Sequence, residues 1–217
     1  ACLVVQYPNF YGYIEDLAGL TEAAHSQEAL IVVSADPTAM GMFQPPGYYG
    51  ADIVTGEGQP LGIPPSFGGP YVGLFSTKQE YIRQMPSRLS GRTVDSQGRT
   101  GYVLTLQTRE QHIRRERATS NICTNEALYA LASTIYLATL GKQGLRQVAE
   151  LCYQKAHYTA DRIAQLPGYS VPIPGIFFQE FVVNCPTSPI DINRRLLEKN
   201  ILGGLDLSEA FSNVPPL

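Results

Sequence analysis

The chain of 217 residues has little charge and no long apolar run. Charged residues make up 16% of it and the formal net charge is −3, so no global charge attracts nucleic acid or an anionic membrane. No apolar stretch approaches the roughly 18 to 20 residues of a membrane span, and the first residues lack a signal peptide's basic flank. We therefore predict a cytoplasmic protein whose partners include neither nucleic acid nor membrane.

Cysteine and histidine are also sparse. The four cysteines stand far apart without a Cys-x-x-Cys pair, which excludes a zinc knuckle or a disulfide scaffold and predicts reduced thiols, mostly in the core. The three histidines stand singly, without metal-ligand spacing, so we expect them at the surface or in packing and predict no metal site. These residues are Cys2, Cys123, Cys152 and Cys185, and His25, His112 and His157.

Lysine is missing from the first 77 residues, because the first one is Lys78. This absence bears on Gly56–Gly73, with the sequence GEGQPLGIPPSFGGPYVG. Such a glycine-rich turn is typical of the segment that follows a cofactor-binding lysine in many α/β enzymes. Residues 1–77 therefore cannot supply the amine that a covalently held cofactor needs.

The apolar content of 44% suffices for a real core, and its pattern predicts an open α/β sheet that is mostly parallel and flanked by helices. Ligands of such sheets bind at the carboxyl ends of the strands. Glu15 and Asp16 suit a helix N-terminus. Because a strand begins at residue 2 without a lead-in, we also expect the chain to be a piece of a longer protein. We predict strands at 2–7, 29–34, 51–55 and 72–76, and a helix at 14–27.

The amino-acid composition changes after the fourth predicted strand. Residues 79–121 contain eight of the twelve arginines and a hairpin signal at Asp95–Gly98, which predicts a long, partly β excursion. Thr124 or Asn125 can cap the next helix; the simplest role of Thr119–Asn121 is also capping, with a cofactor-side role as the alternative. We predict a strand at 102–106, helices at 124–140 (ended by Gly141) and 143–166, strands near 169–172 and 177–184, and a helix near 189–199.

We divide the chain within the second of these long helices. Residues 1–150 form part of a large α/β domain that includes the arginine-rich excursion. Residues 151–217 form a small C-terminal α+β lobe, which we expect to be truncated.

This order of elements resembles the fold type I pyridoxal-phosphate (PLP) enzymes, the aspartate aminotransferase superfamily. A more specific resemblance lies in Ser87–Asp95, in Gly101–Asn125 and in Gln6–Gly12. These runs are similar to the glycine cleavage system P-protein family, whose members are glycine dehydrogenases (decarboxylating). The likeness extends over essentially the whole chain and is closest to the N-terminal half of that family, called subunit 1 when separate.

The resemblance implies that only the other half of the enzyme carries the Schiff-base lysine. Aligned without gaps on Pro46-Gly47-x-x-Gly50-x-Asp52, that lysine would fall near Pro60. The acid that pairs with the pyridine nitrogen would fall at Val33, although Asp36 lies close enough to leave this open. The resemblance therefore implies no catalytic residue and no covalently bound PLP in this chain.

The resemblance also suggests a cross-subunit role for the glycine-rich turn. Backbone N–H groups of Ser66, Phe67, Gly68 and Gly69 are candidates for contacts with the phosphate of the partner's PLP, because glycines permit close approach. The alternative is an inherited tight turn that serves packing alone. Arg88, Arg92 and Arg114 are candidates for holding an anion or the partner surface, against the alternative of a solvated face with local salt bridges.

Two classes of function remain. In the first, the chain is a subunit of glycine dehydrogenase that supports the lysine-bearing subunit 2 in decarboxylating glycine and passing the aminomethyl group to the lipoyl arm of the H-protein. In the second, it is a structural or regulatory dimerisation domain with no cofactor role. An autonomous aminotransferase-like enzyme is disfavoured by the missing lysine.

Overall fold

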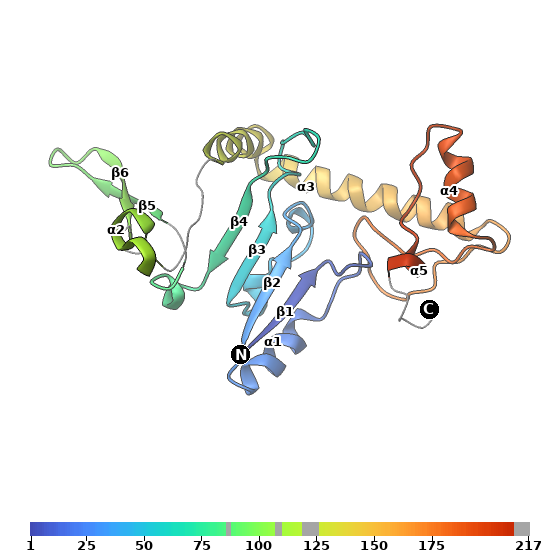
Figure 1. Ribbon diagram of the computed structural model, residues 1–217, viewed down its shortest axis with the longest axis horizontal. Coiled ribbons are helices and arrows are strands. Elements are labelled where there is room, and N and C mark those ends of the chain that lie inside the picture. Colours follow the sequence, from blue (N-terminus) through green and yellow to red (C-terminus); the bar gives the residue numbers. More distant parts are fainter. Residues whose placement is uncertain (86–87, 107–109, 119–125, 211–217) are drawn as a thin grey trace.

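The computed structural model describes residues 1–85, 88–106, 110–118 and 126–210. It places a four-stranded sheet in the middle of an elongated molecule, with a hairpin arm at one end and a helical lobe at the other (Figure 1). The strands are β1 (Cys2–Tyr7), β2 (Leu30–Ala35), β3 (Ile53–Glu57), β4 (Gly73–Thr77), β5 (Leu89–Val94) and β6 (Thr100–Thr105). The α-helices are α1 (Leu17–Ser26), α2 (Gln111–Arg114), α3 (Ala127–Ala164), α4 (Pro189–Leu197) and α5 (Leu207–Ala210).

The sheet has the order β1-β2-β3-β4, with the first three strands parallel and β4 antiparallel to β3. Helix α1 connects β1 to β2, and its N-terminus is capped by the Asp16 side chain, which accepts a hydrogen bond from Gly19 N–H. Leu17 and Ala24 of this helix pack with Ile31 and Val33 of β2 in the main core. The mostly parallel α/β sheet predicted from the apolar runs is confirmed.

Helix α3 is 38 residues long but interrupted. At Gly141 the backbone has φ 59° and ψ −175°, a conformation that only glycine adopts readily, so two helical segments meet there. Both predicted long helices and the break between them are therefore present. Ala149 of the second segment packs against Ala39 and Phe178 in a buried cluster that joins α3 to the sheet domain.

The arginine-rich excursion contains the predicted hairpin, formed by β5 and β6 (Figure 1). Its turn is stabilised by Asp95, whose Oδ1 accepts hydrogen bonds from the N–H groups of Gln97 and Arg99. This arm projects away from the four-stranded sheet.

The predicted strands of the C-terminal lobe are wrong. The described residues there form no ladder; Ser170 and Asn184 make one isolated bridge, and Phe177 makes another with Tyr13 of the sheet domain. Pro172 and Pro174 each remove a backbone donor, which prevents a regular strand at this point. The predicted helix near 189–199 is present as α4. The division of the chain at residue 150 stays a prediction.

The prediction that the cysteines lie mostly in the core is also wrong. Cys2 is exposed and Cys152 and Cys185 are half-buried, all three as free thiols, and Cys123 lies outside the described residues. Cys2 is exposed because β1 is an outer strand of the sheet and presents alternate residues to solvent. Among the helices described, none combines the length and the apolarity that crossing a membrane would require.

Candidate functional site

A crevice of about 230 Å³ lies where the three parallel strands end. This is the edge of an α/β sheet at which ligands bind. Its walls come from the ends of β1, β2 and β3 and from a distant segment around Phe178, which crosses the strand ends. The lining residues are Gln6, Tyr7, Pro8, Gly12, Ser34, Ala35, Asp36, Pro37, Glu57, Pro60, Phe178, Gln179 and Glu180.

Asp36 connects the two sides of this crevice. Its N–H donates to the carbonyl oxygen of Tyr7 at 3.0 Å, which ties the end of β2 to the end of β1. Its carboxylate accepts from Thr38 N–H at 2.8 Å and from Gln179 Nε2 at 3.1 Å. Gln179 belongs to the distant segment, so this last bond joins the C-terminal part of the chain to the sheet over the crevice.

Gly12 allows that segment to approach. Its φ is 88°, and a Cβ atom built on it would overlap the backbone carbonyl of Glu180. Its own carbonyl oxygen accepts a hydrogen bond of 2.9 Å from Phe178 N–H. A side chain at position 12 would therefore force the crossing segment away from the strand ends.

The sequence alignment singled out Pro60 and left a second position open between Val33 and Asp36. Pro60, where the aligned Schiff-base lysine would fall, does line the crevice. Val33 is wholly buried in the core between β2 and α1, whereas Asp36 lines the crevice. Of the two candidates for the position of the acid, Asp36 is the one that reaches this site.

The crevice carries negative charge. Asp36, Glu57 and Glu180 line it, and none of the described residues that line it is a lysine, arginine or histidine. Sequence reasoning missed Glu57, although a carboxylate at the end of a predicted parallel strand was a usable signal. Glu180 carried no such signal, because only the fold brings it to the strand ends.

These lining residues do not fit PLP. Its phosphate needs cations or converging N–H donors, and its attachment needs an amine, but Pro60 offers neither an amine nor a backbone N–H. Three carboxylates would instead repel the phosphate. Among the described residues, no group of three or more His, Cys, Asp or Glu side chains has a geometry that holds a metal ion.

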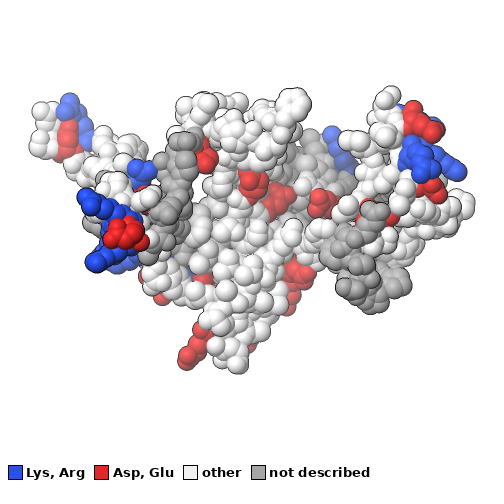
Figure 2. Space-filling model, viewed as in Figure 1, with Lys and Arg blue, Asp and Glu red and all other residues white. Residues whose placement is uncertain are grey.

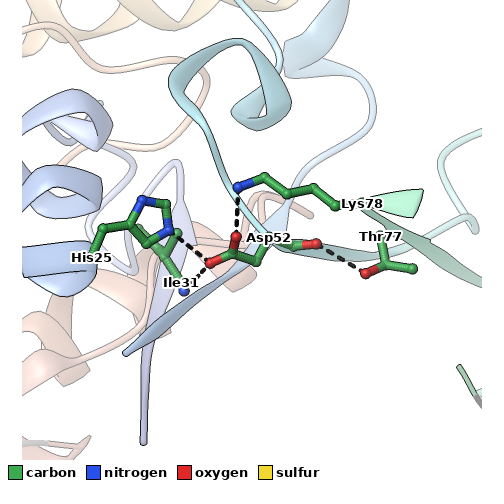
Figure 3. A network of polar contacts seen from close by, with 5 residues as sticks. All are labelled: His25, Ile31, Asp52, Thr77 and Lys78. Atoms are coloured by element: carbon green, nitrogen blue, oxygen red, sulfur yellow. Dashed lines mark hydrogen bonds and ion pairs between the residues drawn. The ribbon is translucent and has the colours of Figure 1, made fainter. Parts of the chain in front are cut away.

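A second polar site lies at the opposite end of the sheet, around the buried carboxylate of Asp52 (Figure 3). Asp52 precedes β3, and its Oδ2 accepts a hydrogen bond of 2.8 Å from Ile31 N–H and lies 2.9 Å from His25 Nε2. Its Oδ1 accepts from Lys78 Nζ at 2.6 Å. Burial by itself raises the pKa of Asp52, but hydrogen bonds from Lys78, His25 and Ile31 outweigh it and lower the pKa to about 2.

This network decides where Lys78, the first lysine of the chain, can act. Lys78 follows β4, which runs antiparallel to β3, so it lies at the amino end of β3 while the crevice lies at the carboxyl end. The five residues of β3 separate the two ends by roughly 16 Å, at ~3.3 Å per residue. Lys78 is therefore held away from the crevice.

The glycine-rich turn does not line the crevice. Ser66, Phe67, Gly68 and Gly69 all have positive φ, at 45°, 57°, 106° and 125°, and the Phe67 side chain is fully exposed. Gly68 N–H is used within the turn, since it donates to Pro65 O at 3.0 Å. The turn thus presents an unusual backbone and a large aromatic ring to the outside of the molecule.

The three candidate arginines lie on the hairpin arm or beside it. Arg92 lies on β5 opposite Tyr102, and Arg114 ends α2; both are exposed. Arg88 is half-buried just before β5. None of the three lines the crevice, and basic side chains gather on the arm in Figure 2. Thr119, Asn121, Thr124 and Asn125 lie outside the described residues.

Comparison with known proteins gives one consistent result. The sequence matches the glycine cleavage system P-protein family over residues 1–213. It is 64% identical over 209 residues to a probable glycine dehydrogenase (decarboxylating) subunit 1 from Thermomicrobium roseum, with 96% of this chain and 47% of that protein covered. A probable glycine dehydrogenase (decarboxylating) subunit 1 from Desulforamulus reducens is 58% identical, with 95% of this chain and 46% of that protein covered. The chain thus spans about half the length of these curated relatives.

The comparison with solved structures agrees with the family match. A crystal structure of glycine decarboxylase (P-protein) of the glycine cleavage system, in inhibitor-bound form, is 48% identical, with a TM-score of 0.88 and 94% of this chain and 46% of that chain covered. Glutamate decarboxylase from Lactobacillus brevis is 18% identical with a TM-score of 0.63, over 93% and 45% of the chains, and shares the fold alone. The fold type I assignment made from the sequence is confirmed.

Proposed function

The chain belongs to the glycine cleavage system P-protein family, and from this premise we propose that it acts in glycine dehydrogenase (decarboxylating) as the subunit without the Schiff-base lysine. The observation that carries the proposal is the crevice at the strand ends. It occupies the ligand-binding edge of the sheet, yet Pro60 and three carboxylates line it where a PLP site needs an amine and phosphate donors. The chain therefore supports an active site that lies in its partner.

PLP belongs, in this proposal, to the lysine-bearing subunit 2, where it takes up the electrons released when glycine loses carbon dioxide. The name of the relatives, subunit 1, supports the existence of that partner. The lipoyl arm of the H-protein receives the aminomethyl group from the assembled enzyme. The free thiols of Cys2, Cys152 and Cys185 suit a cytoplasmic location for this assembly.

The contribution of this chain is the glycine-rich turn, which would line the partner's cofactor site. Gly68 N–H is bonded to Pro65, so we assign the contact with the phosphate to the N–H groups of Phe67 and Gly69 and to the Ser66 hydroxyl. Glycine at 69 keeps the backbone accessible, because a Cβ would hold an anion away. The fully exposed Phe67 ring supports this assignment, because an exposed aromatic at a turn suits a protein contact.

The test combines the complete subunit with the purified lysine-bearing subunit and measures glycine-dependent exchange of carbon dioxide, with H-protein present. We expect exchange only when both subunits are mixed. Full exchange by the lysine-bearing subunit alone would assign this chain to the alternative class, a structural or regulatory dimerisation domain. Exchange by this chain alone would contradict both assignments.

A further inference from the structure

The carboxylates of the crevice have no counter-charge among the described residues. Asp36, Glu57 and Glu180 form no ion pair with any of those residues, although all three line the crevice. The donors that bond Asp36 and Glu57 are uncharged, and Glu57 Oε1 accepts its hydrogen bond of 2.9 Å from Gln59 N–H. Negative charge that no cation of these residues balances thus remains at the edge where such a sheet binds ligands.

Glu57 is held beside the position that a cofactor lysine would need. It ends β3 and lies three residues before Pro60, and both residues line the crevice. Its bond with Gln59, and a second bond of 2.9 Å from Leu61 N–H to Gly58 O, fold the intervening residues into a tight turn. The Glu57 carboxylate and a side chain at position 60 therefore border the same small space.

Glu180 reaches this space only because the crossing segment passes over the strand ends. Phe178 N–H donates to Gly12 O and Ile14 N–H donates to Ile176 O, each at 2.9 Å, which fixes the backbone of that segment. A Cβ at position 12 would come within 2.8 Å of the Glu180 Cβ. The backbone thus holds Glu180 at the crevice, without an ion pair of its side chain.

We propose that Glu57 and Glu180 are specificity-determining residues, whose charge excludes PLP and other phosphorylated molecules from this crevice. The missing lysine prevents only covalent attachment, whereas these two carboxylates oppose binding of the cofactor in any form. The inference rests on the proposed function in one respect, since it deepens the reason why PLP resides in the partner alone.

The two carboxylates act on both reactive ends of the cofactor. The phosphate of PLP is an anion, and like charges that are a few ångströms apart repel each other. An amine placed at position 60 would be kept protonated by the neighbouring carboxylates, which raise its pKa. Only the neutral amine forms the imine, in which its nitrogen bonds to the aldehyde carbon and the aldehyde oxygen leaves as water.

Asp36 is not part of this device. Its carboxylate already accepts two hydrogen bonds, from Thr38 N–H and Gln179 Nε2. By resemblance it is a candidate for the acid that pairs with the pyridine nitrogen, a role that would favour PLP. Asp36 is therefore left unchanged in the test below.

The test places the missing amine in the crevice of the complete subunit and then removes the charge. Pro60→Lys alone is compared with Pro60→Lys combined with Glu57→Gln and Glu180→Gln, which keep the side-chain size. The matched control combines Pro60→Lys with Glu22→Gln and Glu198→Gln, two exposed glutamates that do not line the crevice. Each protein is treated with PLP or with pyridoxal, which lacks the phosphate, and then with borohydride at neutral pH. Mass spectrometry measures the label at position 60.

We expect the two crevice substitutions to raise labelling by PLP about tenfold and labelling by pyridoxal less, with no rise in the control. Equal labelling of Pro60→Lys with and without them would show that the carboxylates do not exclude the cofactor. An equal rise for PLP and pyridoxal would assign the effect to the amine alone, and an equal rise in the control would assign it to net charge. Both results would overturn the exclusion of the phosphate.

A second measurement covers the case in which Pro60→Lys lowers the melting temperature so far that the subunit unfolds. Glu57→Gln with Glu180→Gln in the otherwise wild-type subunit should then bind PLP more tightly in equilibrium dialysis, with a smaller gain for pyridoxal. An unchanged Kd for PLP would overturn the inference. None of these measurements contains the lysine-bearing subunit, so their failure leaves the proposed function standing, and the carbon dioxide exchange described above tests it separately.

Discussion

Asp52 shows how a single carboxylate holds this sheet together. Its side chain is 2% exposed and bonds groups of α1, of β2 and of the residue after β4, each more than 20 residues from Asp52 in sequence. Lys78 and His25 are each more than a third exposed, so part of their charge is solvated. The network joins the antiparallel β4 to the parallel part of the sheet.

Asp52→Asn should lower the free energy of unfolding by about 2 kcal/mol at neutral pH, because a pKa lowered to about 2 reflects stabilisation of that order. Urea unfolding measures this change in the free energy of unfolding. The matched control is Asp95→Asn in the exposed hairpin turn, which should leave the unfolding free energy nearly unchanged. Equal effects of the two variants would contradict a structural role for the buried network.

The same residue predicts an acid-sensitive stability. Because the folded pKa lies below the unfolded value of about 3.9, the contribution of Asp52 is complete above that value and disappears as the pH falls toward 2. Between pH 4 and pH 2, the unfolding free energy of the wild type should therefore fall more steeply than that of Asp52→Asn. Parallel pH profiles would show that other carboxylates account for the acid sensitivity.

At the scale of elements, the break in α3 and the glycine-rich turn both depend on backbone that ordinary residues avoid. Gly141 takes φ 59° between the two helical segments, and no atom lies near enough to obstruct a side chain there. The cost of a substitution at this position is therefore one of backbone conformation alone. The turn places four such residues in succession, from Ser66 to Gly69.

Gly141→Ala should lower the unfolding free energy by roughly 1 to 3 kcal/mol, the cost of holding alanine in a conformation reserved for glycine. Gly47→Ala is the control, since its surroundings are also open and its φ is not in the left-handed region. Thermal unfolding followed by circular dichroism compares the two. A melting temperature of Gly141→Ala at or above the wild-type value would mean that α3 tolerates a continuous helix.

The turn is best tested at Phe67. A substitution at Gly69 is unsuitable because its φ of 125° would strain any other residue and distort the turn itself. In the assembled enzyme, Phe67→Asp should weaken PLP retention about tenfold, because a carboxylate would face the partner's phosphate, whereas Phe67→Ala should have a smaller effect. Equilibrium dialysis measures retention, with subunit association checked separately. Equal PLP retention by the wild type and both variants would show that the turn serves packing and does not contact the phosphate.

At the scale of the whole molecule, the three parallel strands form a ligand-binding edge whose residues disfavour PLP. Borohydride treatment of this chain with PLP should therefore yield no stoichiometric pyridoxyl-lysine, because the crevice has no lysine and Lys78 is bonded to Asp52 at the other end of the sheet. Mass spectrometry of the peptides shows whether a lysine carries the pyridoxyl label. Stoichiometric label on Lys78 would show that the Asp52 network opens and that this lysine reaches a cofactor.

Much of the fold could be predicted because the signals are local. The run Ala29–Ser34 is short and apolar, which favours the buried strand observed at Leu30–Ala35, and Gly141 interrupts a helical pattern visible in the sequence. The predictions of strands near 169–172 and 177–184 were wrong because a strand forms only where a neighbouring strand hydrogen-bonds to it. Phe177 finds Tyr13 of the sheet domain as its partner instead of a neighbouring strand.

The sequence by itself determined that residues 1–77 contain no amine for a cofactor, because a missing side chain stays missing in any fold. It also determined the order of β1, α1, β2, β3 and β4, since apolar periodicity depends on neighbours along the chain. Only the tertiary structure decided that Asp36, Glu57 and Glu180 share one crevice and that Lys78 is bonded to Asp52 at the far end of the sheet. These outcomes depend on which distant segments meet in the folded chain, and local patterns do not contain that information.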